Sequence, residues 1–334
     1  MSNVDARPAE QTVCSAEQQP CAEPELELLE PRDVPLGGPR AMPVRRALPN
    51  RDRRMVGPWC FADTYGPTDI TGQAGMQVPP HPHTGLQTVS WLVDGEILHR
   101  DSVGSRSVVH PGELPLMTAG AGIAHSEQSP PAHSPHLHGA QLWIALPESS
   151  REVSSDFELH RELPSQHDRH GAVTVVLGEF DGASSPATTR SPLVGAALAL
   201  TSGARRTLPL TADFEHAVLA LSTGLTVQGV PVPAGSMLYL GRDRPQVSVA
   251  AEHPAHALLL GGEPFDENLV MWWNFVGRDH DEIVEARRTW ERERDTAAPR
   301  RRFGPVTGYA GPALPAPAMP ATRLRARGRY RRRS

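Results

Sequence analysis

Four side chains that can bind a metal occur as two close pairs in the first half of the chain. The sequence reads His-Pro-His at 81–83 and His-Ser-Glu at 125–127. Residues i and i+2 of a β-strand point to the same face, so each pair would direct two donors to one place. Three imidazoles and one carboxylate suit a first-row divalent metal and leave two octahedral positions open. The spacing predicts a mononuclear catalytic site at His81, His83, His125 and Glu127.

Short strands and tight turns surround both pairs, which is typical of an antiparallel all-β protein. Alternating apolar residues at 86–93 and 96–100 flank Asp94-Gly95, a favoured hairpin turn. A similar run of strands and turns recurs at 216–241. Aligning the two runs on their turns puts apolar or small residues of the second run opposite the predicted ligands: Leu210, Ala212, Ser248 and Ala250. We therefore expect two β-barrels built on one plan, of which only the first binds metal.

The length of 334 residues suits two domains with additional tails. We expect a metal-binding barrel at 41–155 and a metal-free barrel at 156–298. Residues 1–40 are rich in Glu, Gln and Pro, and 299–334 are rich in Pro and Arg, so both segments are predicted to be disordered. One helix is predicted from about Asp279 to Arg294, with acidic residues at its start and arginines at its end, and we expect it to close a barrel end.

Charge is unevenly spread along the chain. Residues 300–334 contain ten arginines and no acid, which leaves −15 for residues 1–299, given −5 for the whole chain. Such a basic tail could contact nucleic acid or the acidic body itself. Nothing else resembles a nucleic-acid motif, so specific nucleic-acid binding is not expected. The sequence also has neither a membrane-length apolar run nor a secretory signal, and we expect a cytoplasmic protein.

The segments around the two pairs resemble a known family. VRRALPNRDRRMVGPWCFADTYGP, HPHTGLQTVSWLVDGEILHRDSVG and TAGAGIAHSE are similar to the N-terminal domain of the pirins, a branch of the cupin superfamily. GGEPFDENLVMWWNFVGRDHDEI resembles the C-terminal domain of bacterial pirin-like proteins. The resemblance covers roughly residues 40 to 295. It implies a monomer with two cupin barrels, in which His81, His83, His125 and Glu127 bind Fe²⁺.

The resemblance implies two functions of different classes. As an enzyme, the protein would act as a quercetin 2,3-dioxygenase on a flavonol or related phenol and dioxygen. Glu127 is then the expected proton acceptor, because a carboxylate can loosen from the metal while the histidines hold it. As a regulator, the protein would sense redox state through iron and bind a protein partner.

Other histidines are expected to have lesser roles. We interpret His138 as a packing residue or a residue beside the ligands, and His99 and His110 as surface or structural residues near turns. His133 and His136, in a proline-rich loop, are candidates for the mouth of the pocket.

Overall fold

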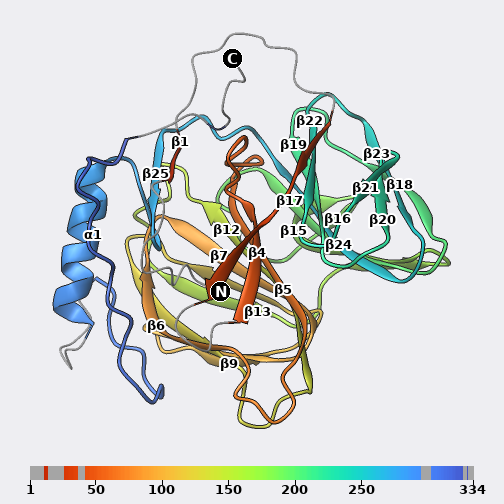
Figure 1. Ribbon diagram of the computed structural model, residues 1–334. Coiled ribbons are helices and arrows are strands. Elements are labelled where there is room, and N and C mark those ends of the chain that lie inside the picture. The colour runs from red at the N-terminus through yellow and green to blue at the C-terminus, as the bar shows by residue number, and fades with distance from the viewer. Residues whose placement is uncertain (1–10, 14–25, 37–41, 295–301, 326–328, 330–334) are drawn as a thin grey trace.

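The computed structural model describes residues 11–13, 26–36, 42–294, 302–325 and 329. Two antiparallel β-barrels lie side by side, and one helix stands beside the first barrel (Figure 1). The predicted all-β fold with two barrels is therefore confirmed.

The first barrel contains the predicted ligands and is made of two sheets. Its larger sheet has the order β13-β10-β7-β12-β5-β4-β3, and its smaller sheet has the order β6-β11-β8-β9. The strands are β3 (Arg32–Leu36), β4 (Met42–Leu48), β5 (Trp59–Asp69), β6 (Gln77–His83), β7 (Leu86–Asp94), β8 (Ile97–Asp101), β9 (Arg106–Val109), β10 (Leu114–Thr118), β11 (Ile123–Gln128), β12 (His136–Ala145) and β13 (Asp156–His160).

The second barrel repeats this arrangement. Its larger sheet has the order β14-β15-β17-β24-β19-β22-β2, with β16 paired to β15, and its smaller sheet has the order β18-β23-β20-β21. The strands are β2 (Glu27–Leu29), β14 (Ser165–Asp168), β15 (Gly171–Phe180), β16 (Ala183–Ser184), β17 (Leu193–Leu200), β18 (Arg205–Pro209), β19 (Glu215–Ala220), β20 (Leu225–Val227), β21 (Val230–Val232), β22 (Met237–Gly241), β23 (Gln246–Ala251) and β24 (Ala255–Gly262).

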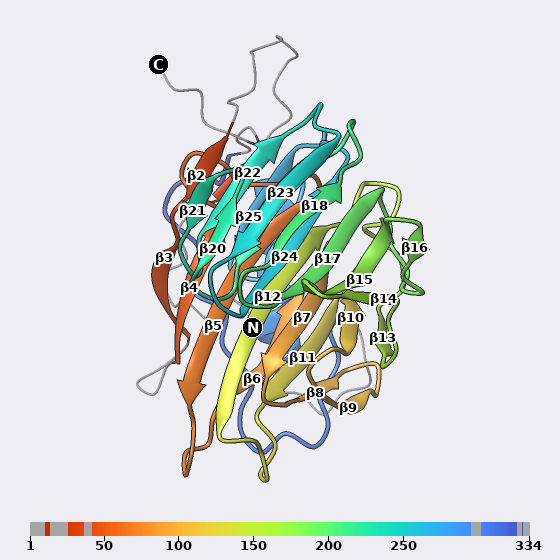
Figure 2. The same ribbon diagram turned by 90° about the vertical axis from the view of Figure 1, so that its right-hand side faces the viewer.

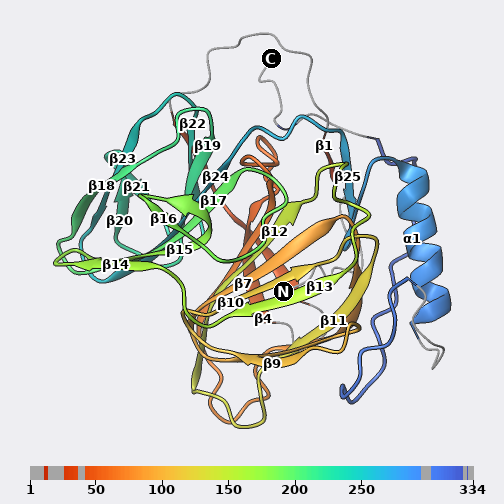
Figure 3. The same ribbon diagram turned by 180° about the vertical axis from the view of Figure 1, so that it is seen from behind.

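Each barrel includes a strand that lies outside its expected boundaries. The early strand β2 pairs with β22 of the second barrel, as Figure 2 shows. The strand β13, which follows the first barrel in sequence, pairs with β10 of that barrel (Figure 3). Residues 156–160 were expected in the second barrel, but they form an edge strand of the first.

The contact between the barrels is apolar and large. It includes Trp59 of β5, whose indole nitrogen donates to the carbonyl oxygen of Gly261 on β24 at 3.0 Å. Leu29 of β2 is buried in the same core. The prediction that residues 1–40 are disordered is wrong for 26–36. This part forms β2 and β3, which pair with the edges of existing sheets. The rest of 1–40, apart from β1, lies outside the described residues.

A third layer covers the outside of the first barrel. The strands β25 (Leu269–Trp272) and β26 (Phe275–Gly277) form a small sheet with β1 (Gln11–Val13). The helix α1 (His280–Glu293) packs against β25 and β26. The side chain of Asp279 caps α1 by accepting hydrogen bonds from the backbone amides of Asp281 and Glu282. The predicted helix is found, on the flank of the first barrel.

The C-terminal segment 302–325 runs between α1 and the first barrel (Figure 1). Phe303 is fully buried, and it packs with Trp290 of α1, Phe275 of β26 and Ala124 of β11. The prediction that this segment is disordered is wrong, because its scattered apolar residues are buried in one cluster with those of α1 and β26. The remainder of 299–334, apart from Arg329, lies outside the described residues.

The strands of the second barrel that correspond to the histidine strands of the first face its core with apolar residues. The alignment of the two runs on their turns, however, placed the wrong residues of β23 opposite the predicted ligands. The strands β18 and β23 take the places of β6 and β11. The alternate residues of β23 that face the barrel core are Val247, Val249 and Ala251, whereas Ser248 is exposed. A shift of one residue moves a strand's side chains to the other face, and turns alone do not determine that shift.

The strands beside β23 also face the core of the second barrel with apolar residues. Leu208 of β18 pairs with Val247, and Leu225 and Val227 of β20 pair with Ala251 and Val249. Of the positions expected opposite the predicted ligands (Leu210, Ala212, Ser248 and Ala250), the two on β23 therefore lie on the other face of their strand. None of the inward residues named here is a metal donor.

Candidate metal centre

Three of the four predicted ligands meet inside the first barrel. His81 and His83 lie on β6 and His125 lies on the adjacent β11, where it pairs directly with His81. All three side chains are fully buried. One ring nitrogen from each lies within 4.8 Å of the other two. The pairing of two short motifs on adjacent strands thus produces a compact three-histidine cluster.

The spacing of the ring nitrogens suits a shared metal ion. The Nε2 atoms of His83 and His125 are 3.1 Å apart. A first-row metal binds imidazole nitrogen at about 2.1 Å, so two nitrogens at right angles around it are roughly 3.0 Å apart and two in a tetrahedron roughly 3.4 Å. The observed distance is close to the right-angled, octahedral value.

Backbone carbonyls determine which nitrogen of two of the histidines carries the proton. Nδ1 of His81 donates to the carbonyl oxygen of Pro79 at 2.7 Å, and Nδ1 of His83 donates to that of Asn274 at 3.2 Å. A carbonyl can only accept, so Nδ1 bears the hydrogen and Nε2 presents its lone pair. Asn274 lies in the turn between β25 and β26, so the outer layer helps to orient a ligand inside the barrel.

Burial keeps the three imidazoles neutral. Desolvation lowers the pKa of His81 to about 4. Desolvation, with repulsion from the neighbouring histidines, lowers the pKa values of His83 and His125 well below the ordinary range. Neutral imidazole is the form that binds a metal. The residues present therefore fit a metal ion at this point.

Glu127, the fourth predicted ligand, is buried on the same strand but is not part of the three-histidine cluster. The pairing of β11 with β6 is irregular between His125 and Glu127, so Glu127 pairs with Val78. Its Oε1 accepts a hydrogen bond from Oγ of Ser90 at 2.9 Å. Burial by itself would raise the pKa of Glu127, but opposing interactions, which include those with His81, His99 and Ser90, lower it. The carboxylate is thus suited to be ionised.

His99, expected to be a surface or structural residue near a turn, is buried beside the three-histidine cluster. It lies inside the barrel on β8, where it pairs with Glu127, and its ring centroid is 5.4 Å from that of His125. Its Nε2 is 3.0 Å from a carboxylate oxygen of Asp101, and its ring stacks on Phe157 of β13 at 4.2 Å. The alternation of Ile97, His99 and Asp101 along one strand face could have indicated this position.

The other histidines lie away from the cluster. His138 is buried at the contact between the barrels, where its Nε2 is 2.8 Å from the carbonyl oxygen of Leu221. His110 is exposed beside Glu113. His133 contacts the backbone of Gln73, and His136 is exposed. The packing role expected for His138 agrees with its position between the barrels.

Aromatic rings form an apolar wall next to the ligands. Phe61 and Trp143 stack with ring centroids 4.0 Å apart, and Trp143 meets the edge of His83 at 5.2 Å. Their bulk excludes water from that side of the cluster. The low polarity of this wall contributes to the desolvation that keeps the histidines neutral.

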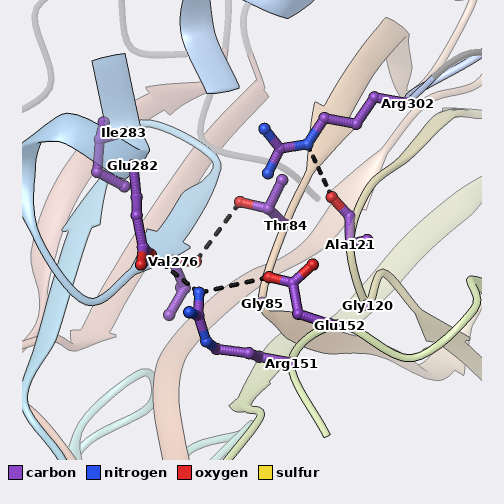
Figure 4. A pocket seen from close by; sticks show the side chains of 11 residues that line it. Thr84, Gly85, Gly120, Ala121, Arg151, Glu152, Val276, Glu282, Ile283 and Arg302 are labelled. Carbon is purple, nitrogen blue, oxygen red and sulfur yellow. Dashed lines mark hydrogen bonds and ion pairs between the residues drawn. The ribbon is translucent and has the colours of Figure 1, made fainter. Parts of the chain in front are cut away.

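A surface pocket lies behind the ligand strands, where the first barrel meets the outer layer (Figure 4). Thr84 and Gly85 on one side face Val276 and Glu282 on the other. Its two arginines are engaged with the protein. Arg151 forms an ion pair with Glu282 at 3.0 Å, and Nε of Arg302 donates to the carbonyl oxygen of Ala121 at 2.9 Å. These contacts fasten α1 and the C-terminal segment to the rim of the barrel.

Comparison with known proteins decides the family. Residues 41–144 match the Pirin family model, and residues 195–295 match the model of the Pirin C-terminal cupin domain. The chain belongs to the pirin family. The three histidines lie in the part that matches the Pirin model, whereas β25, β26 and α1 lie in the part that matches the C-terminal model.

Relatives within the pirin family are similar over most of their length. A Pseudomonas aeruginosa protein provisionally named a quercetin 2,3-dioxygenase is 42% identical over 295 residues, which is 88% of this chain and 91% of that protein. A pirin-like protein of Caulobacter vibrioides is 36% identical over 258 residues, or 74% and 88% of the two chains. The crystal structure titled quercetin 2,3-dioxygenase from Acinetobacter baumannii matches with a TM-score of 0.83 at 36% identity, covering 89% of this chain and 96% of that one.

Among the described residues, no helix has the combination of length and hydrophobicity that a membrane span requires.

Proposed function

We propose that this pirin is a metal-dependent dioxygenase that oxidises a flavonol such as quercetin, or a related phenol, at one Fe²⁺ ion held by His81, His83, His125 and Glu127. The observation that carries the proposal is the cluster of three neutral, buried imidazoles around one point. The names of the Pseudomonas and Acinetobacter relatives support the choice of substrate. Fe²⁺ is proposed because the family resemblance implies it, and the donor set accepts other first-row metals as well.

In the proposed reaction a flavonol loses its 3-hydroxyl proton and takes up both atoms of dioxygen. The central ring opens, carbon monoxide leaves, and the remaining atoms form a phenolic ester of a benzoic acid. The bound metal would supply Lewis acidity and a common binding point for both reactants.

The protein's own residues would orient the reactants and move the proton. Glu127 is the proposed acceptor of the 3-hydroxyl proton, and its lowered pKa makes the carboxylate available as a base at neutral pH. Ser90 holds one oxygen of that carboxylate. The stacked pair Phe61 and Trp143 keeps water from one side of the site.

The test is metal content, measured by mass spectrometry on protein purified without a metal-affinity tag, followed by an aerobic quercetin assay that records carbon monoxide. We expect about one metal per chain in the wild type and loss of both metal and product in His81→Ala. A wild type that stays free of metal after anaerobic iron loading would contradict the proposal.

The alternative, an iron-dependent redox regulator with a protein partner, gains no specific support from the described residues. The resemblance to the pirins implies this alternative, and a partner bound through the arginine-rich tail would favour it. Three of those arginines contact the acidic body itself: Arg302 meets Ala121, Arg323 pairs with Asp281 at 2.6 Å, and Arg329 pairs with Glu215 at 3.1 Å. Binding of the tail to its own body was one of the expected possibilities, and it is the one found for these residues.

A further inference from the structure

Three buried polar side chains form a continuous row across the interior of the first barrel. Oγ of Ser90, on β7, is 2.9 Å from Oε1 of Glu127 and 2.7 Å from the side-chain amide of Gln141. Ser90 and Gln141 pair directly across the ladder between β7 and β12. All three residues are at most 5% exposed. The row connects the proposed fourth ligand to the wall of the larger sheet.

The hydrogen atoms available determine the direction of this row. A serine hydroxyl has one hydrogen, and an ionised carboxylate can only accept. With the amide oxygen of Gln141 facing Ser90, both neighbours of the hydroxyl would be acceptors and one contact would contain no hydrogen. In that orientation Nε2 of Gln141 also has no hydrogen-bond partner, although it is buried.

Rotating the Gln141 amide by half a turn removes the excess of acceptors. The oxygen and nitrogen of a glutamine amide are nearly equivalent in shape, so the hydrogen-bond network decides between them. After rotation, Nε2 donates to Ser90 and the Ser90 hydroxyl donates to Glu127. Each of the two contacts then contains one hydrogen.

We propose that Ser90 and Gln141 are positioning residues that hold the Glu127 carboxylate through this directed row. The inference rests on the proposed role of Glu127. A hydrogen bond to one oxygen restricts rotation of the carboxylate about its Cγ–Cδ bond. Removing the Ser90 hydroxyl removes that restriction.

The test measures binding of Co²⁺ to the full chain by chelator competition, together with the visible absorption spectrum of the bound Co²⁺, which reports ligand geometry. Ser90→Ala is expected to weaken Co²⁺ binding by about 10–100-fold and to change the spectrum, as loss of a partner of a metal ligand typically does. Ser90→Thr keeps the hydroxyl and is expected to restore both. Gln141→Glu keeps an acceptor but cannot donate, so it is expected to weaken binding at least as much as Gln141→Leu.

Ser126→Ala is the matched control. Ser126 lies between two predicted ligands on β11, is fully buried, and has an Oγ without a hydrogen-bond partner. Its side chain points to the opposite face of the strand, so its removal is expected to leave Co²⁺ affinity and spectrum unchanged.

The outcomes separate the two proposals. Co²⁺ binding that weakens in Glu127→Ala but not in Ser90→Ala would overturn the positioning role and leave the proposed function intact. Co²⁺ binding that does not change in Glu127→Ala would overturn the ligand role of Glu127, on which the row depends. Preserved β-sheet circular dichroism in Ser90→Thr and Ser90→Ala shows that each comparison is between folded proteins.

Discussion

Burial suits the three cluster histidines to bind a metal, and two carbonyl groups set the orientation of His81 and His83. Desolvation is the first cause of the lowered pKa of each ring, ahead of any single neighbour. The carbonyl of Pro79 is local to His81, whereas that of Asn274 comes from 191 residues beyond His83. A ligand's chemistry at this site therefore depends on parts of the chain far from its own motif.

At the residue scale, His83→Ala is expected to abolish metal binding and retain the fold, because the barrel is closed by its strands and not by the metal. Metal content should fall from about one per chain to near zero, while the β-sheet circular dichroism persists. His110→Ala, at an exposed residue, is the control and should retain metal. Collapse of the β-sheet signal in His83→Ala would show that the metal is needed for folding.

A second residue, His216 in the second barrel, is expected to make stability depend on pH. Desolvation lowers its folded-state pKa from 6.5 to about 4. Below about pH 6.5 the unfolded state binds a proton that the folded state does not bind, so the free energy of unfolding falls as pH drops towards 4. The loss from this residue is roughly 3 kcal/mol.

Urea unfolding of metal-free protein at several pH values measures this effect. His216→Leu should show a smaller loss of stability between pH 6.5 and 4 than the wild type, whereas His167→Gln, at an exposed residue, should not differ. Equal pH slopes in wild type and His216→Leu would exclude His216 as a source of the acid sensitivity.

At the scale of elements, the strand pair β6 and β11, which carries the predicted ligands, has a counterpart in β18 and β23 of the second barrel. The two pairs differ in how many of their side chains are buried. In β23 only alternate residues are buried, whereas β11 is buried on both faces. The difference arises because α1 and the C-terminal segment cover the outer face of β11, where Ala124 packs with Trp290 and Phe303. Of the two strands, β11, which carries the predicted ligands, is therefore the more deeply buried.

The burial of β18 and of the residue that follows it makes a prediction. Leu208 faces the core of the second barrel, whereas Leu210 only packs against it. Leu208→Ala should lower the free energy of unfolding by about 2–5 kcal/mol, and Leu210→Ala should lower it less. Urea denaturation compares the two variants, and metal content should be unchanged in both. A larger effect for Leu210→Ala would show that Leu208 is not the main core residue at this end of the barrel.

At the scale of the whole molecule, the chain ties the two barrels together in several places. The early strand β2 joins the second barrel, and Arg329 connects Glu215 of the second barrel to the backbone of Arg54 in the first. The amide of Leu314 donates to the carbonyl of Pro80, directly before the predicted ligand His81. The C-terminal segment is thus part of the support of the metal site.

Removing one buried ring tests this support. Phe303→Ala is expected to lower the free energy of unfolding by about 3–5 kcal/mol and to speed loss of metal to a chelator, because the outer face of β11 becomes loosely packed. Thermal and urea unfolding, with the rate of metal loss, measure both effects, and Thr307→Ala at an exposed position is the control. Unchanged stability in Phe303→Ala would show that the segment only lies on the surface.

The sequence by itself determined what local patterns can carry. Alternation and turns predicted two antiparallel barrels, the motif segments predicted the family, and the two short motifs predicted which histidines meet, because side-chain direction along a strand has a period of two. The acidic start and basic end of 279–294 likewise placed the helix, since these features follow from its own dipole.

The tertiary structure alone decided the features that depend on distant partners. No local signal shows that β2 joins the second barrel, that β13 joins the first, that 302–325 packs beside α1, or that Asn274 orients His83. The inward positions of the second barrel and the row from Gln141 to Glu127 also depend on how strands pair. Pairing joins residues far apart in the chain, and a shift of one residue reverses which face is buried, so such contacts become visible only when the strands are in place.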